Sequence, residues 1–296
     1  MTTFNEMTEE VLLNLEGFTL RQDRTTYLTS SINSADLSLA LANGENIGKG
    51  VVEIDEELIH LDSVDRTDRS AVISPFGRGY RGTTAASHDA NAKVTFAPSF
   101  PRLAVKRAIN DTLRSVYPSL YGVANTTFTY SASRTTYSLP ADAETVLFVS
   151  WEAVGPSLEW IPLRRWRHDP MANTSEFATG NTLSVGEAIS PGRTVQVTYA
   201  KTPTALSSNA DVFTTVTGLE ESSRDVIVYG AAYRLASFID PGRLAFTAPE
   251  ADANSETRPF GTGTSTSRYL YSLYNQRLLE EAARLNGKYP VRVHYV

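Results

Sequence analysis

The chain of 296 residues has no cysteine and no long apolar run. Without cysteine it can form no disulfide framework and offers no thiolate chemistry. No apolar stretch approaches the roughly 18 residues that a membrane-spanning helix needs, so no membrane is expected as a partner. The N-terminal segment carries acidic residues and no basic residue before Arg21, unlike a signal peptide. Folding in a reducing cytosol fits these absences, as do other settings.

Lysine is scarce, and most of the basic charge comes from arginine. The net charge is −6, which argues against a general nucleic-acid binder. Five of the 27 basic residues are lysines. Arginine is favoured in protein–protein contacts because its planar fork pairs with carboxylates, although a GC-rich coding sequence produces the same excess. The densest basic run, RRWRH at 164–168, is predicted to contact another protein rather than DNA phosphates.

Motifs of the common enzyme classes are missing. The chain has no G-x-S-x-G of serine hydrolases, and its paired acids fall on predicted surfaces rather than across a cleft. Its histidines show no spacing typical of metal ligands. These are His60, His88, His168 and His294. We therefore expect no catalytic residue, no metal and no cofactor, and predict that the chain is not an enzyme.

One glycine cluster has the spacing of a dinucleotide-binding loop. Gly77, Gly79 and Gly82 form G-x-G-x-x-G after a predicted strand. Such a loop needs a following helix whose N-terminal N–H groups hold the pyrophosphate. Here the segment 83–96 leads straight into another strand. The glycines are therefore predicted to supply positive φ angles within a β connection.

The tryptophans allow two interpretations. Trp151, Trp160 and Trp166 lie in one aromatic-rich segment that could form a platform for a sugar. Core packing is the commoner outcome for such residues. A carbohydrate-binding or carbohydrate-cleaving module therefore stays open as a distant alternative.

The hydrophobic pattern changes period several times along the chain. Residues 3–16 predict a short helix with a capping box between Thr3 and Glu6. Residues 18–98 show alternating runs typical of a small β-barrel or sandwich, including one that places Leu37, Leu39 and Leu41 on one face.

A second helix and a second β region follow. Ser99 is the predicted N-cap of a helix over 101–117, whose stripe comprises Val105, Ile109, Leu113 and Val116. Residues 126–200 predict another antiparallel sheet or sandwich.

The last hundred residues are predicted to be mainly helical. A helix over 219–239 is apolar almost all round, with small residues at its centre that allow close backbone approach. A mobile loop is expected over 247–266, and a final helix over 267–286 is expected to stop at Gly287.

These elements predict an α+β fold in which a helical bundle core carries two inserted antiparallel β units. The N-terminal helix occupies 1–17 and the barrel-like domain 18–98. The remaining parts are a core helix at 99–125, a second β domain at 126–205, C-terminal core helices at 206–288 and a C-terminal extension at 289–296.

Two segments resemble proteins of tailed bacteriophages. The stretch GRGYRGTTAASHDANAKV resembles a virion-protein pattern, R-G-x-x-G-T-x-A-x-x-H-x-x-x-A-x-V, through residues from Arg78 to Val94. Asn91 stands where a glycine is common in that pattern. The C-terminal helices, with YNQRLLEEAARL in the last one, resemble the helical core of phage head-to-tail adaptor (connector) proteins.

The resemblance implies a structural subunit of the virion neck, made in the bacterial host cytoplasm. Such adaptors form a homo-oligomeric ring, commonly a dodecamer, that docks on the portal protein and meets tail or tail-terminator proteins. Genomic DNA passes through the ring's channel without sequence-specific binding. Another virion role, as a tail terminator, baseplate or capsid-associated protein, stays open.

Two groups of residues are candidate interface sites. By the resemblance, the C-terminal extension engages the portal or a neighbouring subunit, and its alternating apolar residues suit addition to a sheet edge; packing on the chain's own second β unit is the alternative. This group comprises Val291, Arg292, Val293, His294, Tyr295 and Val296. A second group is expected between subunits: Arg164, Arg165, Arg167, Ile227, Tyr229 and Tyr233.

Overall fold

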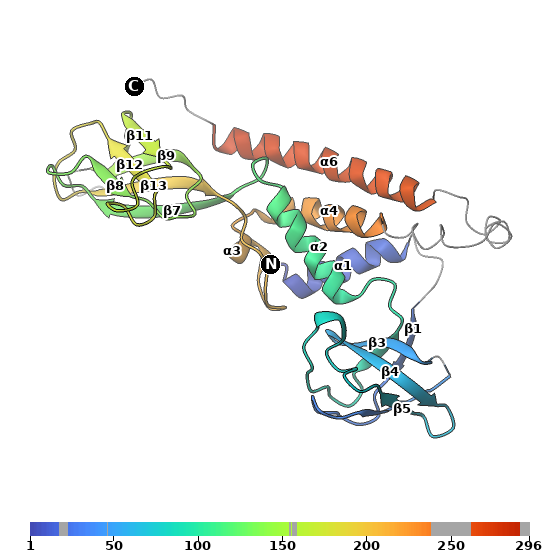
Figure 1. Cartoon of the computed structure of the whole chain (residues 1–296). Coiled ribbons are helices and arrows are strands. Elements are labelled where there is room, and N and C mark those ends of the chain that lie inside the picture. The colour runs from blue at the N-terminus through green and yellow to red at the C-terminus, as the bar shows by residue number, and fades with distance from the viewer. Residues whose placement is uncertain (18–22, 46, 154, 156–158, 238–261, 291–296) are drawn as a thin grey trace. The chain divides into compact units, whose positions relative to one another are not determined.

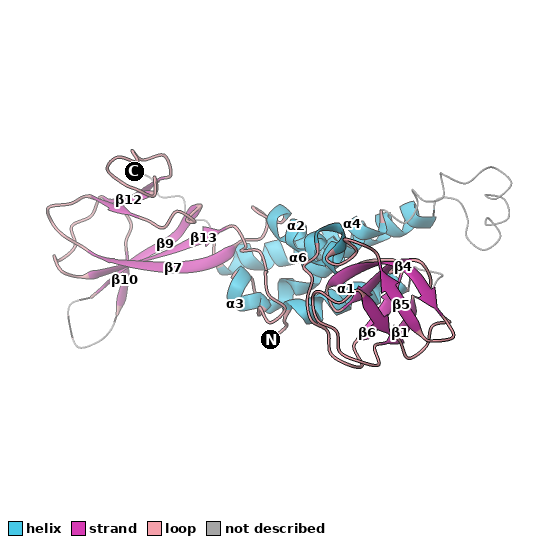
Figure 2. Cartoon of the chain, turned by 60° about the horizontal axis from the view of Figure 1, so that its bottom comes forward, coloured by secondary structure: helices cyan, strands magenta, loops and turns pink. Residues whose placement is uncertain are grey.

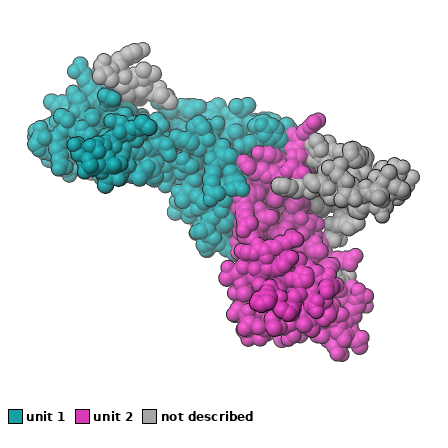
Figure 3. Space-filling model, in the orientation of Figure 1, with its two compact units in different colours: residues 1–7, 110–230, 271–296 teal, residues 8–109, 231–270 magenta. Residues whose placement is uncertain are grey.

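The computed structural model describes residues 1–17, 23–45, 47–153, 155, 159–237 and 262–290. Within these residues the fold is α+β, with five α-helices and three antiparallel sheets. The chain divides into two compact units, coloured separately in Figure 3. Unit 1 comprises residues 1–7, 110–230 and 271–296, and unit 2 comprises residues 8–109 and 231–270.

The helices are drawn in Figure 1. Their bounds are α1 (Phe4–Glu16), α2 (Arg102–Ser115), α3 (Phe213–Thr217), α4 (Arg224–Ala236) and α6 (Thr262–Lys288). Two 3-10 turns, Tyr80–Gly82 and Glu221–Ser223, complete the helical elements of the described chain.

The β sheet of unit 2 curls into a partly closed barrel. Its strands lie in the order β1-β6-β3-β4-β5-β2, and its two outer strands meet where Leu28 pairs with Leu41. Leu39 and Leu41 are buried inside, as expected, but Leu37 is 53% exposed, because β2 begins only at Ser38. The strands are β1 (Arg24–Tyr27), β2 (Ser38–Ala40), β3 (Gly50–Ile54), β4 (Glu57–Asp65), β5 (Ser70–Ile73) and β6 (Lys93–Phe96).

The second β region, in unit 1, contains two antiparallel sheets that share one core. Four strands lie in the order β10-β9-β13-β7 and three in the order β11-β12-β8. Figure 2 labels the four strands of the larger sheet. Buried residues from both sheets, such as Val149, Leu183 and Val197, form a single cluster. The strands are β7 (Gly122–Thr129), β8 (Thr136–Ser138), β9 (Thr145–Glu152), β10 (Trp160–Pro162), β11 (Trp166–Asp169), β12 (Thr182–Val185) and β13 (Thr194–Lys201).

Helix α1 begins with the predicted capping box. The Thr3 N–H donates to the Glu6 carboxylate at 2.8 Å, and the Glu6 N–H donates to Thr3 Oγ1 at 3.3 Å. Both bonds satisfy donors that the first turn of a helix leaves open. Met7, Val11 and Leu15 form the buried stripe of this helix.

Helix α2 begins differently from the prediction. Ser99 does not cap it, because its N–H and hydroxyl donate to Asp23 instead. The helix starts at Arg102, whose N–H donates to the Glu53 carboxylate of β3 at 2.7 Å. A carboxylate is favourable at this position because the N-terminus of a helix carries partial positive charge. The barrel strand thereby holds the start of the helix.

Glu53 is almost completely buried, with 7% of its surface exposed. Burial raises the pKa of this carboxyl to about 7, although the bond from the Arg102 N–H works in the opposite direction. The folded protein therefore retains a proton on Glu53 at pH values where the unfolded chain has released it. Its stability falls as pH rises between the ordinary value of 4.5 and about 7.

Helix α4 makes the close approach that its small residues predict. A Cβ atom on Gly230 would lie 2.3 Å from Thr112 Cγ2 of α2 and 3.1 Å from the Tyr274 ring of α6. Real Cβ atoms do not tolerate the shorter of these distances, so glycine is required where the three helices meet.

Several helix boundaries differ from those predicted. Helix α4 starts at Arg224 rather than 219, because Gly218 (φ 75°) ends α3 and Glu220 is extended. Residues 262–266, expected in the loop, belong to α6, while the rest of that loop lies outside the described residues. Gly287 does not stop α6, which continues to Lys288.

The first prediction concerns the helix contact at Gly230. Gly230→Ala should lower the free energy of unfolding of unit 1 by about 1–3 kcal/mol, because the new methyl group overlaps Thr112. Urea unfolding followed by tryptophan fluorescence measures this, since all three tryptophans lie in unit 1. The matched control is Gly287→Ala, where a Cβ meets nothing within 4 Å and helix propensity should add up to about 1 kcal/mol. Equal effects of the two substitutions would contradict the packing argument.

The second prediction concerns the pH dependence of stability. The native chain should lose roughly 1–3 kcal/mol of its free energy of unfolding as pH rises from about 4.5 to 7. Glu53→Gln keeps an acceptor for the Arg102 N–H but cannot ionise, so this loss should be absent in the variant. The variant should match the native chain near pH 4.5 and exceed it above pH 7. Urea titrations at several pH values, followed by circular dichroism, measure the difference. The exposed Glu45→Gln is the control and should leave the native pH profile unchanged.

Candidate functional site

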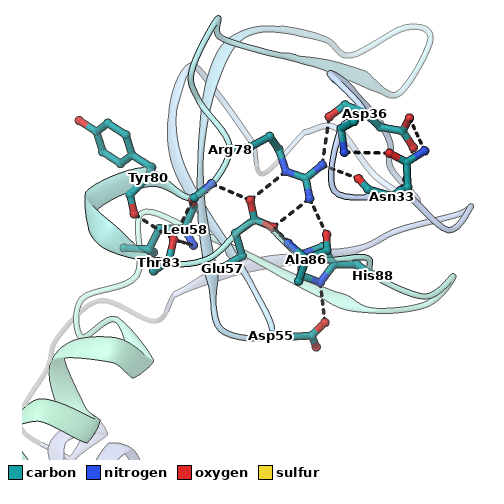
Figure 4. Close-up of polar contacts among 12 residues, drawn as sticks. Asn33, Asp36, Asp55, Glu57, Leu58, Arg78, Tyr80, Thr83, Ala86 and His88 are labelled. Atoms are coloured by element: carbon teal, nitrogen blue, oxygen red, sulfur yellow. Dashed lines mark hydrogen bonds and ion pairs between the residues drawn. The ribbon is translucent and has the colours of Figure 1, made fainter.

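Three residues of the virion-protein pattern, Arg78, Gly79 and His88, bond to one buried carboxylate. Glu57, at the start of β4, is 1% exposed (Figure 4). Arg78, from the loop after β5, donates from Nε to Oε1 at 2.8 Å and from Nη2 to Oε2 at 2.9 Å. This two-pronged pair is the geometry for which the planar guanidinium is suited.

Three further groups bond to the same carboxylate. The Gly79 N–H donates at 2.8 Å, the Ala86 N–H donates at 3.0 Å, and His88 Nε2 lies 3.0 Å from Oε2. Burial alone would raise the pKa of Glu57, but the bonds from Arg78, Ala86, Gly79 and His88 outweigh it and lower the pKa to about 2. The stability this group contributes is therefore present above pH 4.5 and is lost as pH falls towards about 2.

All five N–H groups of the Arg78 side chain bond to other groups of the chain. Besides the two bonds to Glu57, Nη1 donates to the carbonyls of Asn33 (2.6 Å) and Asp36 (3.0 Å), and Nη2 donates to the carbonyl of Ala86 (2.6 Å). A guanidinium has five N–H groups, and these contacts use five. The pair therefore joins the β1–β2 loop and the β5–β6 loop to β4, and no N–H group of Arg78 is left for a substrate.

The glycine cluster serves this same loop. Gly79 and Gly82 have φ angles of 60° and 83°, and a Cβ on Gly77 would lie 2.5 Å from the His60 carbonyl. The Gly79 N–H, which a nucleotide loop would direct at phosphate, is occupied by Glu57. The described residues between β5 and β6 contain a 3-10 turn but no α-helix, so the predicted β connection is confirmed. Positive φ angles occur at Gly79 and Gly82 but not at Gly77, where the prediction is wrong.

Thr83, also part of the pattern, holds the end of the loop. Its hydroxyl accepts the Leu58 N–H at 3.1 Å and donates to the Tyr80 carbonyl at 2.9 Å. The Tyr80 contact closes the turn at 80–82, and the Leu58 contact ties it to β4. The pattern shared with virion proteins is thus a set of residues that build a barrel loop.

The described histidines have protein partners of ordinary kinds. His88 Nδ1 lies 2.7 Å from Asp55, His60 Nδ1 lies 2.6 Å from the Ser74 hydroxyl, and His168 Nε2 lies 2.8 Å from Asn181 Oδ1. His294 lies outside the described residues. In the part of the chain that is described, no group of three or more His, Cys, Asp or Glu is arranged to hold a metal ion.

The tryptophans divide between core and surface. Trp151 and Trp166 pack against the core of the second β region, as expected. Trp160 is 41% exposed, so the prediction that it packs in the core is wrong. Its strand, β10, is at the edge of the four-stranded sheet and offers it fewer neighbours.

The candidate interface residues have different environments. The arginines Arg164, Arg165 and Arg167 are exposed around the start of β11. Tyr229 and Tyr233 on α4 are half-buried, while Ile227 is completely buried within this chain and presents no surface in this conformation. The C-terminal residues 291–296 lie outside the described residues.

A comparison with protein families assigns the chain. A family model described as SU10 adaptor protein matches residues 83–284. The chain belongs to the SU10 adaptor family. This is a family of phage head-to-tail adaptors, so the resemblance seen in the sequence is confirmed. The match begins at Thr83 and therefore rests mainly on the second β region and the helices. No curated protein matches the chain, and none of the described helices is long and apolar enough to cross a membrane.

Sequence reasoning missed two buried acceptors on the barrel strands. Glu57 was expected on a surface as one of a pair with Glu56, and Glu53 carried no signal for capping a helix 49 residues later. Both carboxylates are identified only by partners that are distant in the sequence.

The third prediction concerns the buried pair. Arg78→Lys should destabilise the barrel by about 2–4 kcal/mol, because a single ammonium cannot bond both carboxylate oxygens and three carbonyls. The exposed Arg66→Lys is the matched control and should change stability by less than about 0.5 kcal/mol. Hydrogen exchange of β4 amides reports the barrel directly. Native protection of the β4 amides in Arg78→Lys would refute the role assigned to the two-pronged pair of Arg78 and Glu57.

Proposed function

We propose that the chain is a structural, non-enzymatic subunit of a phage head-to-tail connector ring. The single observation that carries this is the adaptor-family match across residues 83–284, which spans α2, the second β region, α3, α4 and most of α6. The ring docks on the portal protein, extends the DNA channel towards the tail and meets tail or tail-terminator proteins. The resembled family implies a dodecamer that passes DNA without reading its sequence.

The proposed ring contacts involve the helices and the exposed arginines. Helices α2, α4 and α6 form a helical core that packs within and between copies. Support comes from large side chains on α6 that are exposed: Leu279 is 71% exposed, and Tyr271, whose ring contacts Tyr274, is 47% exposed. Residues eight positions apart lie on roughly the same side of a helix. A neighbouring subunit would cover them.

The arginine run supplies a second proposed contact. Arg164, Arg165 and Arg167 are exposed on the second β region. Their planar guanidinium groups could pair with carboxylates of an adjacent chain. The half-buried Tyr229 and Tyr233 of α4 join this set where they reach the surface. Residues 291–296 engage the portal through main-chain pairing in the assembled neck.

The fourth prediction tests the ring. Purified chain mixed with the portal protein of its own phage should give rings on the portal by negative-stain imaging and native mass spectrometry. Leu279→Glu should abolish ring formation, because the introduced charge would be buried between subunits. A chain ending at Pro290 should lose portal docking.

The control for the ring is an exposed polar position. Asn286→Ser on the same helix should assemble as the native chain does. A chain that stays monomeric and ignores the portal under all salt conditions would refute the proposal. Rings that assemble normally with Leu279→Glu would refute only the contact assigned to α6.

A further inference from the structure

Strand β7 leaves one edge of its sheet open. Among the described residues it pairs with β13 alone. The opposite edge, β10, has three residues and includes Pro162, which is how exposed edges are usually protected. β7 has eight residues, GVANTTFT, with neither a charge nor a proline. Its open edge therefore lacks the features that normally prevent another strand from pairing.

The register identifies which groups of β7 point away from the sheet. The Tyr130 N–H donates to the Arg193 carbonyl at 2.8 Å, so bonding to β13 recurs at every second residue from Tyr130. At the other end Ala200, opposite Val123, accepts from the Glu144 N–H at 3.0 Å on the β9 side. Odd-numbered residues of β7 therefore direct their N–H and C=O groups outward. They are Val123, Asn125, Thr127 and Thr129.

The core of the sheet is incompletely covered at this edge. Ala124 and Phe128 pack against the buried cluster, yet both remain partly exposed. Phe128 stacks on Tyr137 with ring centroids 4.1 Å apart. An added strand would remove this apolar rim from water, which is worth about 25 cal/mol per Å².

The chain leaves α6 beside the same edge. A cavity of about 260 Å³ is lined by Val123 and Asn125 of β7 and by Leu285, Lys288 and Tyr289 at the end of α6. The residues after Pro290 read VRVHYV, in which valine and tyrosine alternate with arginine and histidine. Six extended residues span about 20 Å, less than the length of β7.

We propose that residues 291–296 add to the open edge of β7 of the same chain as a parallel strand. The pairing is parallel because the segment starts at the N-terminal end of β7 and must run along it. Val291, Val293 and Tyr295 then continue the core-facing side beside Ala124 and Phe128. A segment tethered next to its acceptor has an effective concentration in the millimolar range, so pairing within one chain outcompetes pairing between chains in dilute solution.

This inference concerns the isolated chain and does not depend on the ring. In the neck the same segment would leave the edge of β7 and pair with the portal protein instead. The strand exchange adds a step to assembly but no new contact type, because main-chain hydrogen bonds serve in both states.

Hydrogen exchange measured by NMR tests the inference on the isolated protein. In the full chain, amides of Val123, Asn125, Thr127 and Thr129 should exchange at least about tenfold more slowly than in a chain ending at Pro290. The amides of Ala124, Thr126 and Phe128, which bond to β13, should be equally protected in both and serve as the internal control.

Two variants separate strand addition from general stabilisation. Thr127→Pro removes an outward donor that β13 does not use, so it should abolish the protection of Val123, Asn125 and Thr129. Thr127→Val should retain it. In the chain ending at Pro290, both variants should unfold at similar urea concentrations, which shows that the fold itself is intact.

Three results would overturn the proposal. The first is equal exchange in the full and truncated chains. The second is protection that rises with protein concentration, which would assign the edge to a second copy. The third is unchanged protection in Thr127→Pro. None of these results bears on ring formation with the portal, which is measured separately.

Discussion

The barrel of unit 2 depends on a carboxylate that has been taken out of water. Glu57 is compensated there by Arg78, by two backbone N–H groups and by His88. Losing one partner of such a pair leaves the other charge buried alone, which costs several kcal/mol. The pair therefore makes the long loop between β5 and β6 part of the barrel rather than an appendage of it.

A second carboxylate links the barrel to a helix. Glu53 lies in β3, and its acceptor holds the first turn of α2. The two acids respond to pH in opposite directions, because Glu57 is stabilised as an anion while Glu53 is not. The barrel thus shows both outcomes of burying a carboxylate. Donors more than offset the cost of removing Glu57 from water, whereas they offset it only in part for Glu53, whose pKa is raised.

Local patterns in the sequence were enough to predict much of this fold. The capping box at Thr3 and Glu6, the stripe of α2 and the small residues around Gly230 each depend on neighbours a few positions away, and each is present. Predictions failed where a distant group decided the outcome. Ser99 lost its capping role to Glu53, and Trp160 is exposed because β10 is an edge strand.

The candidate site followed the same rule. The glycines at 79 and 82 were predictable, since positive φ favours glycine in a tight connection. The acceptor that organises them was not, because nothing in the spacing of Glu57 and Arg78 indicates that they are paired. The family match, in turn, depends on residues 83–284 and so on parts of the chain beyond this loop.

The contact between Leu28 and Leu41 has a consequence for how the barrel evolves. There the two outer strands of the sheet pair with each other, so the backbone at that point is already hydrogen-bonded and only side chains remain on the surface. A side-chain surface changes one residue at a time, without rebuilding a strand. Point substitutions can therefore change the outer surface of the barrel without altering its backbone pairing.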